Sequence, residues 1–306
     1  MVCPEGCSGN GENINCFNDT DSSKTTILHK VKNIIFKAKT KFQDVKMVEF
    51  ENFGKSLILD GIIQSSMGDE FMYSELLVQP AMIANSILNR DSQKKVLILG
   101  GGEGATSREV LKHKDVAKVV MIDIDGELVN ACKKYFPEMH QGAFDDKRHE
   151  LRIGDAIDYL KKTDEKYDVI IGDLVDPKSE LARLFYTKAM FKKISRMLHP
   201  HGIFVTQSAD VTNNIFAQKD NNYLTNIYQL SKGIFKHVDF SYEYIPSFSD
   251  YWSWILCSDE ISADKISNSV DDIIKEKGIK LRYYNSETHK RSFSISKDIK
   301  DFLTRK

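Results

Sequence analysis

The 306-residue sequence contains no run of about eighteen apolar residues, so we expect no segment to cross a membrane as a helix. Its first residues also lack the apolar core of a signal peptide, and the sequence therefore predicts a cytoplasmic protein. An excess of charge of one sign is absent too, because 43 basic and 44 acidic side chains leave a formal net charge of −1. We therefore expect neither nucleic acid nor a membrane surface as a partner.

Cysteine is scarce and irregularly placed. The five cysteines are an odd number, which fits reduced thiols in a cytosolic protein better than a disulfide framework. Cys3, Cys7 and Cys16 lie in a segment rich in Gly, Ser, Asn and Asp, and we interpret residues 1–23 as a disordered tail. A metal site in this tail is disfavoured because no histidine lies near the thiols, and the sequence predicts no metal.

The next unit, residues 24–90, begins with predicted strands. Residues 45–50 and 55–60 both have strand composition, and Asn52 and Gly54 between them predict the turn of a hairpin. A helix with an acidic first turn is predicted to begin near Asp69 and to continue to Leu88.

From residue 91 to residue 306, predicted strands and helices alternate. Two later strand-like segments, 237–244 and 252–257, are joined by a short loop and should pair antiparallel. A plain dinucleotide-binding fold lacks such a terminal hairpin, whereas an adenosylmethionine-type sheet contains one. The sequence thus predicts an α/β protein: a Rossmann-like, methyltransferase-type doubly wound sheet with a small N-terminal β domain. The strands that alternate with helices lie near 95–100, 118–123, 149–154, 167–172 and 202–207.

The first of these strands runs into three consecutive glycines and then a helix, which is typical of a nucleoside site. Gly100, Gly102 and Ala105 satisfy the pattern G-x-G-x-x-G/A, and glycine lets the backbone approach a ligand. Asp123, about twenty residues further on, is placed to bind ribose hydroxyls. Asp125 is equally well explained as the N-cap of the next helix. Nicotinamide enzymes share this pattern, so it does not by itself identify the cofactor.

Acidic residues follow each of the first four strands of this sheet. Asp155 and Ala156 follow the third, where they could contact an adenine amino group or, for Asp155, cap a helix. Asp173 and Asp176 follow the fourth. The acids should converge on one edge of the sheet, where open α/β sheets bind ligands.

Glu103, inside the glycine loop, indicates which ligand the loop holds. A carboxylate would repel a phosphate but would favour a cationic group. Intact adenosylmethionine has a carboxylate on its tail, whereas the decarboxylated form keeps only the amine and the sulfonium. Glu103 therefore favours the decarboxylated form, and the alternative is a solvated loop acid.

Several motifs together resemble the polyamine aminopropyltransferases, the spermidine and spermine synthase family. The resemblance extends over residues 27–298, and residues 172–177 and 245–254 are most similar to thermospermine synthases. The motifs are Leu59-Asp60-Gly61-Ile62-Ile63-Gln64, Asp69-Glu70-Phe71-Met72-Tyr73, Gly100-Gly101-Gly102-Glu103-Gly104, Asp123-Ile124-Asp125, Gly154-Asp155-Ala156, Asp173-Leu174-Val175-Asp176-Pro177, and Tyr284-Asn285 with His289 and Phe293.

The resemblance implies transfer of an aminopropyl group from decarboxylated S-adenosylmethionine to a polyamine, with release of methylthioadenosine and without a metal. It implies a homodimer or a larger assembly such as a homotetramer. By position, Gln43, Gln64, Glu103, Asp123 and Asp155 would contact the nucleoside, beside Gly100, Gly102 and Ala156. Tyr73, Asp173, Asp176, Gln207 and Phe248 would line the amine side.

Two departures from the family pattern concern the amine side. Ser74 stands where relatives usually have Gln or His, so one contact is expected to be lost or bridged by water. Lys178 and Arg183 follow Pro177, and we expect both to face solvent because cations beside the polyamine path would repel it.

The chemical obstacle is the protonated nucleophile. An amine with a pKa near 10.4 costs roughly 4–5 kcal/mol to deprotonate at about pH 7. We assign proton removal to Asp173, with Asp176 and Tyr73 positioning the nitrogen. The alternative is that both aspartates only cap and turn the chain before Pro177.

More distant groups are candidates for holding the other ammonium groups of the amine. Asp250 could do so, and its alternative is a solvated loop acid. Glu243 could also do so, and its alternative is an acid on the face of a strand. Trp252 and Trp254 should share one face of their strand, where core packing is the favoured interpretation and a cation–π wall is the second.

The predicted function is the formation of thermospermine from spermidine. The alternatives are a spermidine synthase acting on putrescine, an N-methyltransferase using intact S-adenosylmethionine, and a polyamine-binding relative that has lost catalysis.

Overall fold

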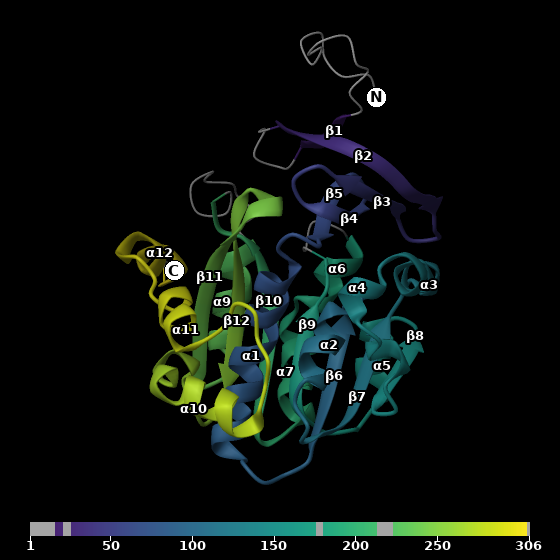
Figure 1. The fold of residues 1–306 in the computed structure, drawn as a ribbon. Coiled ribbons are helices and arrows are strands. Elements are labelled where there is room, and N and C mark those ends of the chain that lie inside the picture. The colour runs from purple at the N-terminus through teal and green to yellow at the C-terminus, as the bar shows by residue number, and fades with distance from the viewer. Residues whose placement is uncertain (1–15, 21–25, 176–179, 213–222, 305–306) are drawn as a thin grey trace.

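The computed structural model describes residues 16–20, 26–175, 180–212 and 223–304. Figure 1 shows a small antiparallel sheet lying over one end of a larger α/β unit. This arrangement confirms the predicted fold class. None of the described helices is both long and apolar enough to cross a membrane.

The small sheet contains five strands in sequence order: β1 (Cys16–Thr20), β2 (Thr26–Lys39), β3 (Asp44–Phe50), β4 (Gly54–Leu59) and β5 (Ile62–Ser66). The predicted hairpin is β3–β4, in which Phe50 pairs with Gly54. Cys16–Thr20 differ from the prediction of a disordered tail, because they pair antiparallel with residues 26–30 of β2. Cys3 and Cys7 lie outside the described residues.

Helix α1 (Glu70–Leu88) follows the small sheet, as predicted, but packs on the large sheet. Leu76, Leu77, Val78 and Met82 are fully buried together with apolar residues of the large sheet. The sequence analysis grouped this helix with the N-terminal unit. The difference arises because α1 carries buried residues on all of its sides. It therefore needs packing partners that the small sheet alone does not supply.

The large sheet has the strand order β11-β12-β10-β9-β6-β7-β8. The chain runs outward from β6 to β8 and then returns to β9 on the other side of β6, so a topological switch point lies between β6 and β9. The predicted terminal hairpin is β11–β12, and β12 also pairs antiparallel with β10. The strands are β6 (Lys94–Gly100), β7 (Val116–Asp123), β8 (His149–Ile153), β9 (Tyr167–Asp173), β10 (Leu198–Asp210), β11 (His237–Ile245) and β12 (Asp250–Ser258).

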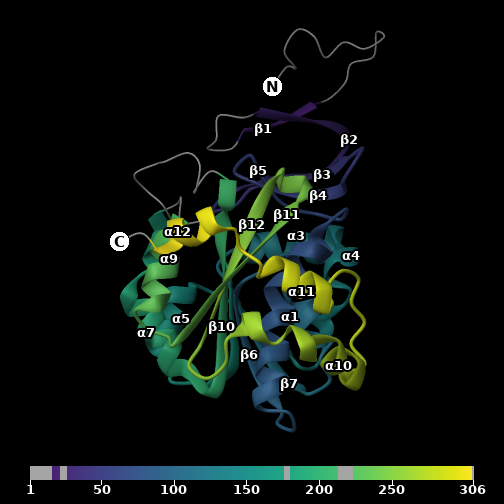
Figure 2. The ribbon, with the colours of Figure 1, turned by 90° about the vertical axis from the view of Figure 1, so that its left-hand side faces the viewer.

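Helices cover both faces of this sheet (Figure 2). One core lies under α1, α2 (Ala105–Leu111) and α10 (Ser267–Lys277). The other lies under α5 (Ala156–Lys162), α6 (Glu180–Phe185), α7 (Lys188–Met197), α9 (Tyr223–Lys232) and α12 (Lys297–Thr304). The C-terminal segment forms α10, α11 (Ser286–Ser292) and α12.

A third apolar cluster joins the small sheet to the large unit. Met47 and Leu57 of the small sheet pack against Leu128 and Phe136. Leu128 lies in α3 (Gly126–Tyr135), and Phe136 directly follows that helix. The short helix α4 (Pro137–His140) comes next. The small sheet thereby lies over the ends of the parallel strands.

A buried ion network fixes α1 against α2. The Arg108 guanidinium donates to both carboxylate oxygens of Glu70, at 2.9 and 2.8 Å, and to Glu109 at 3.0 Å. Glu75 accepts three backbone N–H bonds from residues 282–284, each 2.8 Å long. Removing one partner of such a network leaves an unpaired buried charge, which costs about 3–5 kcal/mol. The first two turns of α1 are therefore held rigidly beside the start of α2.

Candidate active site

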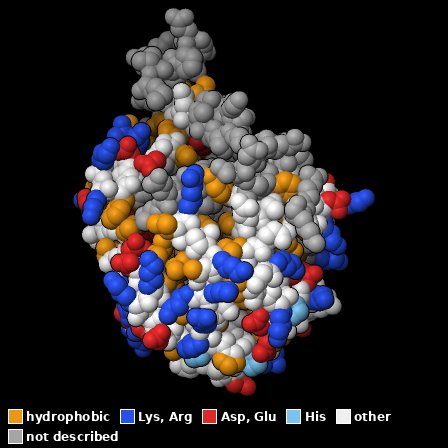
Figure 3. Space-filling model, turned by 180° about the vertical axis from the view of Figure 1, so that it is seen from behind, with side chains coloured by type: hydrophobic (Ala, Val, Ile, Leu, Met, Phe, Trp, Pro, Cys, Tyr) orange, Lys and Arg blue, Asp and Glu red, His pale blue; other side chains and the backbone are white. Residues whose placement is uncertain are grey.

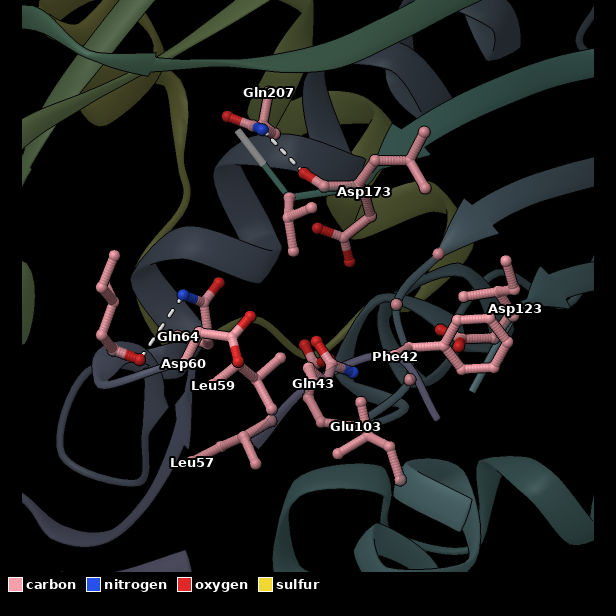
Figure 4. A pocket seen from close by; sticks show the side chains of 18 of the residues that line it. Phe42, Gln43, Leu57, Leu59, Asp60, Gln64, Glu103, Asp123, Asp173 and Gln207 are labelled. Carbon is pink, nitrogen blue, oxygen red and sulfur yellow. Dashed lines mark hydrogen bonds between the residues drawn. The ribbon is translucent and has the colours of Figure 1, made fainter. Parts of the chain in front are cut away.

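A cavity of about 590 Å³ lies between the small sheet and the carboxyl ends of the parallel strands (Figure 4). Asp176 lies outside the described residues. The other residues predicted to contact the nucleoside or to line the amine side, together with Asp250, all line this cavity, which gives their location and leaves their roles as predictions. They are Gln43, Gln64, Tyr73, Gly100, Gly102, Glu103, Asp123, Asp155, Ala156, Asp173, Gln207, Phe248 and Asp250.

The glycine loop is tight because the end of β9 passes directly beside it. Gly100 pairs with Asp173 in the sheet, and a Cβ at position 100 would lie 2.1 Å from the Asp173 carbonyl oxygen. A Cβ at Gly101 would lie 3.2 Å from Asp173 Oδ2, and one at Gly102 would lie 3.0 Å from Asp123 Oδ2. Gly100 also has a positive φ of 84°. The glycines therefore make room for the site's own carboxylates as well as for a ligand.

Asp173 is held at the end of β9 by two hydroxyl groups from two helices. Tyr73 of α1 donates to Oδ1 at 2.9 Å, and Thr106 of α2 donates to Oδ2 at 2.6 Å. Burial raises the pKa of Asp173, and the bonds from Thr106 and Tyr73 act in the opposite direction. In Figure 4 the carboxylate points into the cavity. Sequence reasoning missed Thr106, because a threonine in the first turn of a helix carries no signal of such a contact.

The cavity is lined by one sign of charge. None of its described lining residues is Lys, Arg or His. On the face of the molecule that Figure 3 shows, by contrast, both basic and acidic side chains are present. Among the lining carboxylates, Asp19, Asp60 and Asp210 were missed by the sequence analysis, although Asp60 lies in a quoted motif. The lining carboxylates are Asp19, Asp60, Glu103, Asp123, Asp155, Asp173, Asp210 and Asp250.

Crowding of these groups disfavours their ionised forms. Burial, followed by the charge of Asp173, raises the pKa of Glu103 above its ordinary value. Burial is also the main cause that raises the pKa of Asp123 to about 6. Burial and like charge thus favour the protonated forms of Glu103 and Asp123, and a cationic ligand would favour their ionisation.

The caps proposed as alternatives for Asp125 and Asp155 are present. Asp125 caps α3 by accepting from Leu128 N at 3.0 Å, and its other oxygen accepts from Gln43 Nε2 at 2.9 Å. Asp155 caps α5 by accepting from Ile157 N at 2.7 Å. Asp155 also lines the cavity, so capping and ligand contact are compatible at this position.

Gln207 braces the loop that follows β9. Its amide group donates to the Leu174 carbonyl at 2.7 Å (Figure 4) and accepts from Ala209 N at 2.9 Å. A register irregularity between Gln207 and Asp210 accompanies a positive φ of 78° at Ala209. Residues three apart in a regular strand face opposite sides, so this irregularity explains how both Gln207 and Asp210 reach the cavity.

Aromatic rings form the wall beyond Asp173. The Phe248 ring packs edge-on against Trp252, with centroids 4.9 Å apart, and against Tyr73 at 6.1 Å. Trp254 is fully buried in the core, as the favoured interpretation predicts. Trp252 instead lines the cavity. Glu243, for which an amine ligand and a strand-face acid were the two alternatives, pairs with Arg291 and is not among the residues that line the cavity, which favours the second alternative.

Two of the residues that depart from the family pattern, Ser74 and Arg183, are not among those that line the cavity. Ser74 is buried and donates to the Glu70 carbonyl within its own helix at 2.8 Å. Arg183 is exposed and donates to the Tyr223 hydroxyl, which confirms that it faces solvent. Lys178 lies outside the described residues.

Fold and cavity together define an α/β protein with an acidic cavity at the switch point of its large sheet. Models of two known domains match most of the chain: a spermidine synthase tetramerisation domain over residues 17–66 and a spermine/spermidine synthase domain over residues 70–267. The chain therefore belongs to the spermine/spermidine synthase family.

Individual relatives agree with these matches. The chain is 42% identical over 276 residues to a polyamine aminopropyltransferase of Saccharolobus solfataricus, covering 89% of this chain and 87% of that protein. It is 40% identical over 278 residues to one of Sulfurisphaera tokodaii, covering 90% and 88%. A solved spermidine synthase in complex with the transition-state analogue AdoDATO superposes with a TM-score of 0.86 at 27% identity, covering 99% of this chain and 97% of that chain. The spermidine synthase of Thermotoga maritima superposes with a TM-score of 0.83 at 26% identity, covering 99% and 96%.

The loop geometry generates a prediction for Gly100. Replacing it with alanine should lower the free energy of unfolding by more than about 2 kcal/mol, because the new methyl group overlaps the β9 backbone at a positive φ. Gly154→Ala is the matched control, since open space surrounds its Cβ position, and it should change stability by less than about 1 kcal/mol. Urea unfolding of both variants measures the difference. Equal stabilities would contradict the packing argument.

Proposed function

We propose that the chain transfers the aminopropyl group of decarboxylated S-adenosylmethionine to spermidine, forming thermospermine and releasing 5′-methylthioadenosine. The reaction class, aminopropyl transfer in polyamine biosynthesis, follows from the family to which the chain belongs. The acceptor and the roles of individual residues are the part we propose. An N-methyltransferase, considered from the sequence, has no support among the family matches.

One observation supports this function above all others, namely a cavity lined by carboxylates with no cationic side chain among its described lining residues. Such a cavity disfavours phosphates and carboxylates, including the tail of intact S-adenosylmethionine. Both substrates of aminopropyl transfer are cations, and each supplies the positive charge that the site lacks.

Within the cavity, we assign the nucleoside end to the residues around the glycine loop and the strand ends beside it. Asp123 binds the ribose hydroxyls, and Asp155 with Ala156 binds the adenine. Glu103 binds the aminopropyl ammonium group, with Gln43 and Gln64 completing the wall from the small sheet. Asp123, Asp155 and the glycine loop lie at or just after the carboxyl ends of β6, β7 and β8, where a ligand at a switch point is expected.

Asp173 is the proposed general base. The acceptor amine loses a proton to Asp173 as its nitrogen bonds to the aminopropyl carbon, and the bond from that carbon to sulfur breaks. The sulfonium leaves as a neutral thioether, methylthioadenosine. Tyr73 and Asp176 position the amine, and its approach within about 3–3.5 Å of the carbon supplies much of the rate increase.

The acceptor side supports a polyamine longer than a diamine. Beyond Asp173, the cavity wall carries Asp210 and Asp250 together with the Phe248 and Trp252 rings. Carboxylates and aromatic faces both hold ammonium groups, and spermidine has two of these besides the reacting nitrogen. Residues 172–177 and 245–254 are also the stretches most similar to thermospermine synthases. Putrescine, with one remaining ammonium group, is the alternative acceptor.

We further propose a cytoplasmic homodimer or homotetramer. The match to a tetramerisation domain covers the small sheet, residues 17–66. Strand β2 in that sheet exposes Leu28 and Ile34, at 44% and 47% of their surfaces, and apolar side chains on a sheet of this kind suit contact with a second copy.

The acceptor is tested by product analysis. Incubation with decarboxylated S-adenosylmethionine and spermidine should yield thermospermine, whereas putrescine should react more slowly at equal concentration. Chromatography that separates spermine from thermospermine identifies the isomer. Preferential formation of spermidine from putrescine would make the chain a spermidine synthase, and spermine as the product would contradict the proposed regiochemistry. Absence of methylthioadenosine with every amine would indicate a relative that has lost catalysis.

The base assignment predicts the behaviour of Asp173→Asn. Turnover should fall by about 10²–10⁴-fold, because general base catalysis is lost. The dissociation constant of decarboxylated S-adenosylmethionine should change much less, since the nucleoside contacts remain. Asp91→Asn is the control for loss of a charge at an exposed position. Unchanged turnover in Asp173→Asn would contradict the assignment.

The raised pKa values of Glu103 and Asp123 predict proton release on binding. A dicationic ligand favours the ionised carboxylates, so its dissociation constant should fall as pH rises from about 5 to 8, by up to tenfold per pH unit for each proton released. Calorimetry in two buffers of different ionisation enthalpy measures the protons. Methylthioadenosine, which lacks both charges, should show little pH dependence. The same dependence for both ligands would contradict this explanation.

A further inference from the structure

The contact between Thr106 and Asp173 has no part in the function described so far. The Thr106 side chain is fully buried, and its hydroxyl donates to Asp173 Oδ2 at 2.6 Å. A buried hydroxyl group in a fold is normally satisfied by a neutral acceptor or by water. Here its acceptor is the carboxylate at the centre of the cavity.

The local structure is built to allow this contact. Thr106 lies in the first turn of α2, and Asp173 lies at the end of β9. Gly101 is close to both side chains. A Cβ at Gly101 would lie 3.2 Å from Asp173 Oδ2 and 3.7 Å from the Thr106 Cβ. The absence of a side chain at position 101 therefore leaves the space in which hydroxyl and carboxylate meet.

The two hydroxyl donors fix the carboxylate differently. Tyr73 binds Oδ1 and Thr106 binds Oδ2, so together they set the plane of the carboxylate and prevent its rotation about the last side-chain bond. Each oxygen of an ionised carboxylate has two lone-pair sites, so one site on each stays available for an incoming amine. Loss of the Thr106 bond would leave only one fixed oxygen.

The charges around Asp173 make these donors important. Glu103 from the glycine loop and Asp123 from β7 are near enough for their charges and that of Asp173 to disfavour one another. Tyr73 of α1 touches Asp173, and Tyr186, which follows α6, lies near Tyr73. No Lys, Arg or His appears among the described lining residues. Hydroxyl donors are thus what the described site provides to stabilise the ionised form.

We propose that Thr106 is a positioning residue, whose hydroxyl orients the Asp173 carboxylate and stabilises its ionised form until the acceptor amine binds. The inference rests on the proposed role of Asp173 as general base. Thr106 does not touch the reacting atoms and acts only through Asp173. The proton still passes from the amine nitrogen to Asp173, as the N–C bond forms and the C–S bond breaks.

Thr106→Val tests this role, because it keeps the shape of the side chain and removes the hydroxyl. A hydrogen bond to a charged group stabilises it by about 1.5–3 kcal/mol. The acidic limb of the pH–rate profile should therefore move to higher pH by about one unit or more. At a pH well above this limb, the turnover of Thr106→Val should return close to that of the parent. Thr106→Ser keeps the donor and should leave the limb within about 0.3 units of the parent.

Thr106→Ala serves if valine is not accommodated, because it also lacks the hydroxyl and is smaller. The stability of each variant and its affinity for methylthioadenosine show whether the fold and the nucleoside site are intact. A loss of turnover that is equal at every pH, with the limb unmoved in both Val and Ala variants, would overturn the proposal. So would an equal shift in the Ser variant.

The experiment also separates this inference from the base assignment. If Asp173→Asn retains turnover, Asp173 is not the base, and that result concerns the proposed function. If Asp173→Asn loses turnover while the Val and Ala variants keep the parent limb, Asp173 is the base and Thr106 does not position it.

Discussion

The site depends on a constraint of charge, because the charged side chains among its described lining residues are all carboxylates, and Asp173 is partly buried among them. Burial favours the protonated form of Asp173, and two hydroxyl donors oppose it. The described cavity wall offers no side-chain cation to Asp173, Glu103 and Asp123. A ligand with several positive charges would therefore offset the repulsion between these carboxylates, which the fold holds close together. The same arrangement disfavours anions, so the selectivity and the acid–base chemistry that we propose would have one electrostatic origin.

This electrostatic arrangement requires two helices to be fixed relative to each other. Tyr73 is carried by α1 and Thr106 by α2, and both must reach the end of β9. The buried pairing of Arg108 with Glu70 and Glu109 connects those helices one turn from the two donors. A buried ion pair contributes little net stability compared with apolar packing, but it forms only when the distances and orientations of its partners are close to ideal. The network is thus well suited to set the spacing of the two hydroxyls.

Local pattern predicted the architecture wherever apolar periodicity was strong. The parallel strands, the β3–β4 and β11–β12 hairpins and α1 all lie close to where the sequence indicated. Less regular segments were missed: β1 has the composition of a disordered tail, and most of β2 is exposed, so it lacks the alternation of a half-buried strand. The docking of α1 on the large sheet was missed as well, because chain order does not show which of two units buries a helix.

By itself, the sequence determined the strand ends and the acidic residues that follow them, because parallel strands bring their carboxyl ends to one edge whatever the details of packing. Only the tertiary structure decided which groups touch there. Tyr73 and Asp173 are 100 residues apart and Thr106 and Asp173 are 67 apart, and no local pattern encodes contacts over such separations. The irregularity in β10 that brings Asp210 into the cavity, and the backbone approach that requires Gly100, likewise arise from how neighbouring strands pack.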